Sequence, residues 1–285
     1  MASFGAAPSA VPAYNLSKNQ TPSDENVGLW SAADAGNAKD AREFLKMNGN
    51  PNWRKHQEGG QTAFHRATAG GHLEVVELLL QTIPAEEGGV PLLPVEFPAV
   101  LDIKATVDQN TPLHLAAAGG ELQVMNILVE RGAPINATNQ LGNTPLHLSC
   151  SMNQTLAARE LIIAGADVCA LNKRGSTTLL FAIYGLPPGE DTVGLVALLL
   201  EGGVDVNAQD SNGASALHAA ASKGLVKVTE KLLDCGADVT LKDAVGKDAA
   251  HYAKTRGHDE VFFSINAVPR HETHDSKMVE IINAN

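Results

Sequence analysis

The sequence predicts an all-α solenoid, in which short helix-turn-helix units stack in a row and are joined by β-hairpin-like loops. Two observations lead to this prediction. The tetrapeptide Thr-Pro-Leu-His occurs at residues 111–114 and again at residues 144–147, which is 144 − 111 = 33 residues later. Hydrophobic residues make up 44% of the 285 residues, but aromatic residues only 4%. The core must therefore be assembled from small aliphatic side chains, which suits thin layers of helices.

Related tetrapeptides keep the same period through most of the chain. They are TAFH at Thr62, TTLL at Thr177, SALH at Ser215 and DAAH at Asp248. Successive starts at 62, 111, 144, 177, 215 and 248 are therefore 49, 33, 33, 38 and 33 residues apart. A period of this kind indicates one supersecondary unit per repeat, and the two longer intervals indicate insertions.

The best copy carries the chemistry of a helix start and a helix end. Thr111 is placed as an N-cap, whose hydroxyl accepts a backbone N–H, and Pro112 follows at the first helical position. Ala116 is small because helices of neighbouring copies approach closely there. Gly120 is expected to end the first helix in a left-handed conformation, and Asn153 takes that place in the next copy.

This copy, NTPLHLAAAGGELQVMNILVERGAPINA at residues 110–137, resembles the ankyrin repeat. Six copies are readable from about residue 61, and a degenerate first copy, LWSAADAGNAKDAREFL, spans residues 29–45. We number the copies one to seven along the chain. The resemblance predicts a flexible leader at residues 1–26, an ankyrin repeat domain of six to seven repeats at 27–266 with a long insertion at 81–108, and a tail at 267–285.

Five of the ten histidines occupy the fourth position of the tetrapeptide. They are His65, His114, His147, His218 and His251. The resemblance implies that each ring bonds the N-cap residue with one nitrogen and the backbone of a neighbouring repeat with the other. The histidines are therefore interpreted as structural groups, in preference to metal ligands or catalytic groups.

The pattern breaks in two places. Copy five has Leu180 in place of the histidine, and it carries an insertion at Tyr184–Gly194. The insertion at 81–108 contains four prolines, which forbid a regular helix, together with many apolar residues. The favoured interpretation is a loop packed on its own repeats, and the alternative is an accessory partner site.

No residue set for catalysis can be recognised. The string at residues 271–275, HETHD, has the wrong spacing for a zinc-binding HExxH motif, and no nucleophile elbow, phosphate loop or dinucleotide motif is present. Cys150, Cys169 and Cys235 form no CxxC pair and are interpreted as reduced thiols of an intracellular protein. The prediction is a protein that is not an enzyme and has no cofactor and no metal.

Composition also limits the partners and the compartment. A net charge of −11 argues against a general nucleic-acid binder and against binding to anionic membranes. No apolar run reaches the roughly 20 residues that cross a bilayer, and the N-terminus lacks a signal-peptide pattern. These features predict a cytoplasmic or nuclear protein, which is expected to be a monomer.

The resemblance implies that a partner binds the concave side, which is formed by the hairpin tips and the first helices. The candidate residues are exposed tip and first-helix positions of copies four to seven: Gln140, Leu141, Met152, Lys173, Arg174, Tyr184, Ser211, Asn212, Lys223, Val245 and Arg256. Met152 and Tyr184 are larger than the scaffold requires, and four of these residues are basic. They predict a partner segment with acidic residues and an apolar anchor.

The function implied by the resemblance is non-catalytic protein–protein interaction, as a scaffold, adaptor or inhibitor. The alternative is an assembly chaperone of a multisubunit complex, resembling the ankyrin-only proteins that bind proteasomal ATPase subunits. Ankyrin repeats are also recurrent substrates of an asparaginyl hydroxylase. Asn136, with Leu128 eight residues upstream, and Asn207, with Leu199, match the modified position.

Overall fold

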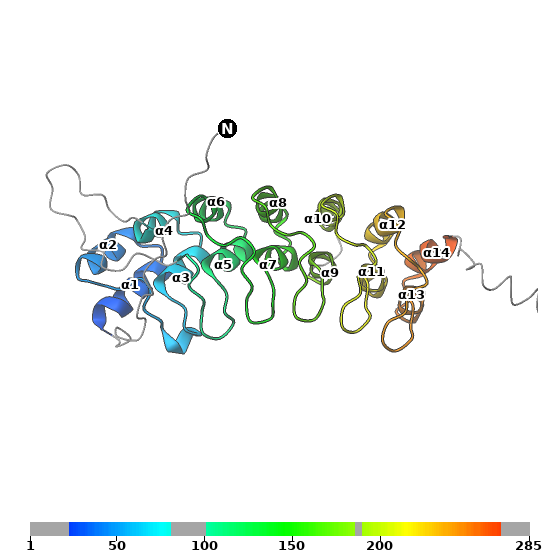
Figure 1. The fold of residues 1–285 in the computed structure, drawn as a ribbon, viewed down its shortest axis with the longest axis horizontal. Helices are drawn as coiled ribbons and strands as arrows, with labels where there is room; N and C mark the ends of the chain where they lie inside the picture. Colours follow the sequence, from blue (N-terminus) through cyan, green and yellow to red (C-terminus); the bar gives the residue numbers. More distant parts are fainter. Residues whose placement is uncertain (1–22, 81–100, 186–189, 269–285) are drawn as a thin grey trace, which may run out of the picture.

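The computed structural model describes residues 23–80, 101–185 and 190–268, with only the backbone described at 190–192. Within these ranges the chain forms fourteen α-helices and one 3-10 helix, η1 (His56–Glu58), and no β-strand. Figure 1 shows the helices in two parallel rows along an elongated, gently arched molecule, with hairpin loops projecting from one side. The predicted all-α solenoid is confirmed.

Each copy contributes one helix to each row. The first row contains α1 (Asp24–Asp34), α3 (Ala63–Ala69), α5 (Pro112–Gly119), α7 (Pro145–Ser151), α9 (Thr178–Tyr184), α11 (Ala216–Lys223) and α13 (Ala249–Thr255). The second row contains α2 (Ala38–Lys46), α4 (Leu73–Leu80), α6 (Leu122–Glu130), α8 (Thr155–Ile163), α10 (Glu190–Glu201), α12 (Val226–Asp234) and α14 (Asp259–Ala267). Helices contact their neighbours within a row and their partner in the other row.

The helix ends form where the sequence places them. Thr144 caps α7 by accepting the backbone N–H of His147, and Pro145 stands at the first helical position. Gly120 ends α5 with φ +75°, and Asn153 follows α7 with φ +55°. Both residues adopt the left-handed conformation that glycine and asparagine tolerate best. At the N-terminus, Ser23 caps α1, so residues 24–26 of the predicted leader belong to a helix.

The core runs along the whole array between the two rows. Leu113, Ala116 and Ala117 of α5 are completely buried, which confirms that small residues are needed where first-row helices meet. Leu128 of α6 closes the same layer from the second row. Because every layer is covered by the next one, burial in this fold depends on contacts between copies.

The described end of the long insertion packs on its own repeats. Ile103 and Ala105 are buried, and the Thr106 hydroxyl donates a 2.9 Å hydrogen bond to the Gly59 carbonyl. Lys104 reaches the next copy, where its ammonium donates to the Thr138 carbonyl at 2.7 Å. These contacts agree with the favoured interpretation for residues 101–108. Residues 81–100, the rest of the insertion, lie outside the described residues, as do 186–189 of the second insertion and most of the tail.

Candidate functional site on the concave face

The recurring histidines are buried connectors between copies. Nδ1 of His114 accepts from the backbone N–H of Thr111 at 3.2 Å and lies 2.8 Å from its hydroxyl. With Nδ1 accepting, Nε2 carries the proton and donates to the Asn143 carbonyl of the next copy at 2.9 Å. The same bridge to a carbonyl of the next copy is made by His65 to Asn110, His147 to Ser176 and His218 to Lys247. The structural interpretation is confirmed for these four histidines.

Copies five and seven depart from this arrangement. Leu180 of copy five is fully buried, and its side chain cannot form the hydrogen bonds that the histidine forms in other copies. The helix cap remains, in which the Thr177 hydroxyl accepts the Leu180 N–H at 3.2 Å. The prediction was wrong for His251, whose side chain is exposed and contacts the Tyr252 ring. Its helix is the first-row helix of the last copy, so within residues 23–268 no further copy supplies a carbonyl.

Burial sets the protonation of this network. It lowers the pKa of His65 and of His114 to about 4, and it lowers the pKa of His147 as well. These rings are therefore neutral near pH 7, as their hydrogen bonds require. Across the described ranges, no cluster of three or more His, Cys, Asp or Glu residues could hold a metal ion.

The three cysteines lie in different surroundings. Cys150 is completely buried, and burial raises the pKa of its thiol to about 12, so it is an unreactive core residue at neutral pH. Cys169 and Cys235 are exposed, and all three thiols are free.

The hairpin tips are joined into one continuous edge. In each tip a backbone N–H donates to a carbonyl of the preceding tip, at 2.8 to 3.0 Å: Gln140 to Asp108, Lys173 to Leu141, Ser211 to Arg174, and Ala244 to Asn212. These bonds fix the spacing between tips, and they place the predicted tip residues side by side along the concave face.

The tips of copies four to seven each contain an Asn or Asp five residues before the start of the tetrapeptide, and this side chain holds the backbone of the tip. Its Oδ1 accepts two backbone N–H groups of the tip, as Asn172 does from Arg174 and Ser176 at 2.9 and 3.0 Å. Asn139, Asp210 and Asp243 act in the same way. This position was not predicted from the sequence, although its recurrence at every tip from Asn139 onward was a usable signal.

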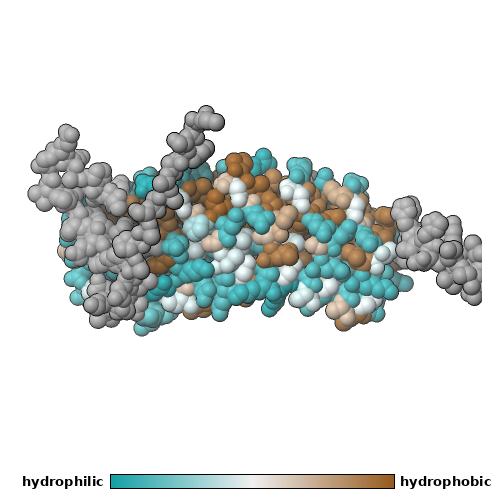
Figure 2. Space-filling model, in the orientation of Figure 1, coloured by the Kyte–Doolittle hydropathy of each residue, from teal (hydrophilic) through white to brown (hydrophobic). Residues whose placement is uncertain are grey.

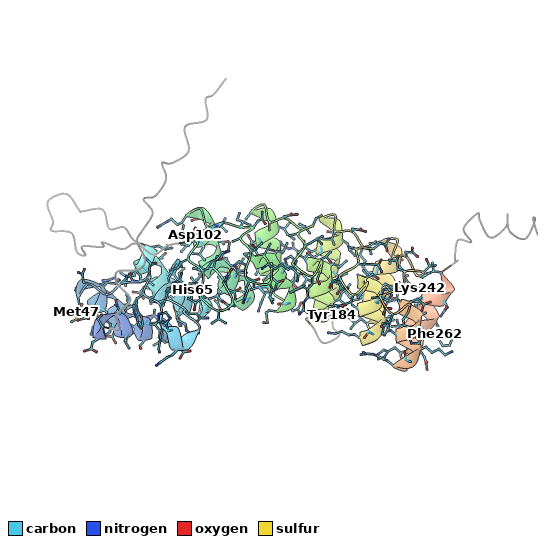
Figure 3. All side chains as sticks on the ribbon, turned by 60° about the horizontal axis from the view of Figure 1, so that its bottom comes forward. Met47, His65, Asp102, Tyr184, Lys242 and Phe262 are labelled. Atoms are coloured by element: carbon cyan, nitrogen blue, oxygen red, sulfur yellow. The ribbon has the colours of Figure 1, made fainter. Side chains whose placement is uncertain are left out.

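Five of the predicted partner-binding residues converge on one cleft of about 560 Å³. They are Leu141, Lys173, Arg174, Tyr184 and Asn212. The remaining lining consists of Asn143, Ser151, Asn172, Ser176, Phe181, Gly185 and Asp210. The cleft therefore lies between the tips of copies four to six and the ends of α7 and α9. In Figure 3, which brings the hairpin side forward, Tyr184 lies near the middle of the array.

The other six predicted residues lie outside the lining of this cleft. Met152, at the end of α7, is 59% exposed, and Val245, at the last tip, is 72% exposed. Gln140, Ser211, Lys223 and Arg256 are also outside the lining.

Three of the predicted basic residues bind the scaffold itself. Lys173 donates to the Gln140 carbonyl at 2.7 Å, Lys223 to the Tyr184 carbonyl at 2.6 Å, and Arg256 to the Ser222 carbonyl at 3.3 Å. Each bond joins two copies, so these side chains stabilise the array as well as carrying charge. The Arg174 guanidinium makes no hydrogen bond or ion pair within the described part of the chain, and it is exposed.

Tyr184 combines an apolar ring with a polar end. Its side chain is 48% exposed at the cleft. Burial, followed by the negative charge of Asp210, raises the pKa of the phenol, which is therefore protonated and able to donate. Together with Leu141 and Phe181 it forms an apolar surface beside two cations, Lys173 and Arg174.

The two asparagines that match the hydroxylation pattern bridge neighbouring copies. Oδ1 of Asn136 accepts the Asp167 N–H at 2.9 Å, and Oδ1 of Asn207 accepts the Asp238 N–H at 2.8 Å. Their amide groups donate to Gly165 and Gly236 carbonyls at 3.4 and 3.2 Å.

Stacked helix pairs whose hairpin tips form one continuous edge define a repeat solenoid with a binding surface along its side. The chain belongs to the ankyrin-repeat family. The family model described as ankyrin repeats (3 copies) matches residues 29–139, 85–172, 153–243 and 190–265. No curated protein matches the chain. Ankyrin repeats are generally protein–protein interaction modules, and proteins built from them are typically non-catalytic. Among the described helices, none has the length and apolar character needed to cross a membrane.

Proposed function

We propose that the chain is a non-catalytic recognition module, acting as a scaffold, adaptor or inhibitor, that binds a segment of another protein across copies four to seven. We also infer that its helix pairs are seven ankyrin repeats. The observation that carries the functional proposal is the cleft of about 560 Å³ on which Leu141, Lys173, Arg174 and Tyr184 converge. The scaffold requires no exposed leucine or tyrosine at these positions, and exposed apolar groups that line a concave surface are typical of binding sites.

The chemistry of the cleft favours a partner with one apolar anchor and an adjacent acidic residue. Leu141 is 58% exposed and faces the same cleft as Tyr184, so an apolar side chain would bury surface against both. An acidic side chain would be attracted to Arg174, whose charge is not neutralised by an ion pair with any described residue. Asn212 and the Tyr184 hydroxyl supply hydrogen-bond donors at the same rim.

The double variant Leu141→Ala with Tyr184→Ala is expected to lose at least tenfold in affinity for the partner, because two anchors at the centre of an interface are removed. A tagged full-length chain is used to isolate partners from its native cell, and the affinity is then measured by titration. Met152→Ala, outside the cleft lining, is expected to have a smaller effect. Phe263→Ala is the matched control, since Phe263 is 68% exposed on α14.

The dependence of affinity on salt concentration distinguishes the acidic part of the proposed partner from its apolar part. Affinity should fall as ionic strength rises, because exposed charges are screened, and Arg174→Gln should remove most of this dependence. Partners that are retained equally by the double variant would show that the cleft is not the binding site. If a partner is lost but its affinity is indifferent to salt, the acidic part of the proposal fails and the apolar part stands.

The alternative function for the same face is that of an assembly chaperone. Recovery of a proteasomal ATPase subunit that is bound to the chain before assembly, and absent from it in the finished complex, would favour that role over a lasting scaffold.

We further propose that Asn136 and Asn207 are hydroxylated in the native cell. Intact-mass analysis should show increments of one oxygen atom, and fragmentation should place them at these two residues. Chain isolated from the same cells with Asn136→Ala and Asn207→Ala is the control and should lack the increments. An unmodified wild-type mass would contradict the proposal.

A further inference from the structure

Helix α8 exposes an apolar stripe on the outer side of the array. Leu156 is 63% exposed and Ile163 is 73% exposed. They are seven residues apart on one helix, which is close to two turns, so both side chains point to the same side.

The other copies show that the scaffold does not require this stripe. Leu156 is twelve residues after the start of its tetrapeptide (156 − 144), and Ile163 nineteen (163 − 144). Allowing for the insertion in copy five, the residues that match Leu156 are Glu74, Gln123, Gly194, Lys227 and Glu260. The residues that match Ile163 in copies three, five, six and seven are Glu130, Glu201, Asp234 and Ala267. Among the described second-row helices, α8 therefore differs in having large apolar residues at both positions.

The stripe lies where a flat or convex surface can reach it. Figure 1 shows the second row as an arch with α6 and α8 at its crest, and Figure 2 shows hydrophobic residues gathered at that crest. A hollow of about 490 Å³ adjoins Leu156 between Leu122 and Gly194, and a smaller one of about 100 Å³ adjoins Ile163 beside Val129.

The charges between the two apolar residues are self-complementary. Arg159 and Glu160 occupy the turn between Leu156 and Ile163, and at about 100° per residue they lie on opposite sides of the stripe. Neither forms an ion pair with any described residue. If two copies of α8 pack side by side in the same direction around a two-fold axis, each Arg159 faces Glu160 of the second copy. Packing in opposite directions would instead bring like charges together.

We propose that α8 is the contact of a two-fold homodimer, in which the occupant of the stripe is α8 of a second copy of this chain. Leu156 and Ile163 pack against the same residues of the second copy, and two Arg159–Glu160 pairs flank them. Such a contact is isologous, because one patch serves both subunits. This dimer replaces the monomer expected from the sequence. One helix pair buries little surface, so the association is weak and depends on concentration.

The position of α8 determines where the two clefts lie in the dimer. Because α8 lies in the second row, on the side opposite the hairpin tips, the dimer leaves both clefts open and directs them away from each other. The dimer would thus present two binding sites, and a partner with two matching segments would gain avidity. The dimer itself does not depend on the proposed partner, so the two proposals can fail separately.

Sedimentation equilibrium of the full chain over a concentration series tests the contact. The wild-type mass should rise from that of one chain toward that of two. The double variant Leu156→Gln with Ile163→Glu, which introduces the residues of copy three, should remain monomeric with an unchanged circular dichroism spectrum. Phe263→Ala removes an exposed apolar group elsewhere and should dimerise like the wild type.

Charge reversal tests the direction of packing. Arg159→Glu alone and Glu160→Arg alone should each weaken self-association at least tenfold, because each places like charges opposite one another in the dimer. An equimolar mixture of the two variants should regain the wild-type association, because a mixed dimer pairs opposite charges again. A wild-type chain that stays monomeric overturns the proposal. The stripe would then be a binding site for a helix of another protein. A dimer that is unaffected by the stripe variants, or a mixture that fails to recover, overturns the contact or its direction.

Discussion

Lowering the pH from 7 to 5 should destabilise the array by about 4 kcal/mol through His65 and His114 alone. Burial lowers the pKa of each from 6.5 to about 4. Between these two values the unfolded state binds more protons than the folded state, so the free energy of unfolding falls as the pH falls. Each ring contributes about 2 kcal/mol of loss at pH 5. His147, whose pKa burial also lowers, adds to the loss in the same direction.

Urea unfolding followed by circular dichroism at pH 7, 6 and 5 measures this effect. The stabilising contribution is complete above pH 6.5, is lost progressively below it, and stops changing once the pH falls below about 4. Because repeat arrays can unfold in parts, the transition should be followed with probes in more than one copy. A urea midpoint that is constant from pH 7 to pH 5 would contradict the assignment of these rings as buried neutral groups.

The variant His114→Leu should lose about 3 kcal/mol or more of stability at pH 7. It leaves the Asn143 carbonyl and the Thr111 N–H buried without their partner, and each orphaned group costs about 1–3 kcal/mol. Leucine itself fits such a position, since Leu180 fills it in copy five and is fully buried. The loss therefore measures hydrogen bonding between copies three and four, with little contribution from steric strain.

The chain supplies its own control for this experiment. His251→Leu makes the same change at the matching position of copy seven, where the side chain is exposed. Its effect should stay within about 0.5 kcal/mol. His114→Leu should also flatten the dependence of stability on pH, because one of the titrating rings is gone. Equal losses from both variants would show that the network between copies contributes nothing measurable.

The buried histidine network belongs to the part of the molecule that the sequence predicts best. The 33-residue period, the N-caps such as Thr144 and the left-handed ends at Gly120 and Asn153 are local, and they repeat several times along the chain. Local signals that recur in register support one another, so the helix pairs and their order could be predicted from the residues alone. The buried histidines were predicted for the same reason, and the prediction failed at His251, because the described residues after α14 form no further copy that could complete the network.

The sequence also predicted that several partner-binding candidates lie on one surface. It could not predict which of them line the same cleft. Leu141 belongs to copy four, Tyr184 to copy five and Asn212 to copy six, and only the stacking distance decides that they share a cleft while Met152 does not line it. The basic residues illustrate the same limit. Lys223 was expected to contact a partner protein. Its ammonium donates instead to the Tyr184 carbonyl, which is 39 residues away in the sequence.

The ankyrin-repeat solenoid follows from the order of the residues alone, because period, caps and small core residues are properties of a single repeat. How the hairpin tips join, which side chains meet in the cleft and which side of α8 stays uncovered are visible only in the packed array. Those features arise from contacts between copies, and the burial of any one residue depends on what its neighbours place against it. A leucine such as Leu156 follows the same helical pattern whether it is covered or exposed, and only the packed array shows that it is exposed.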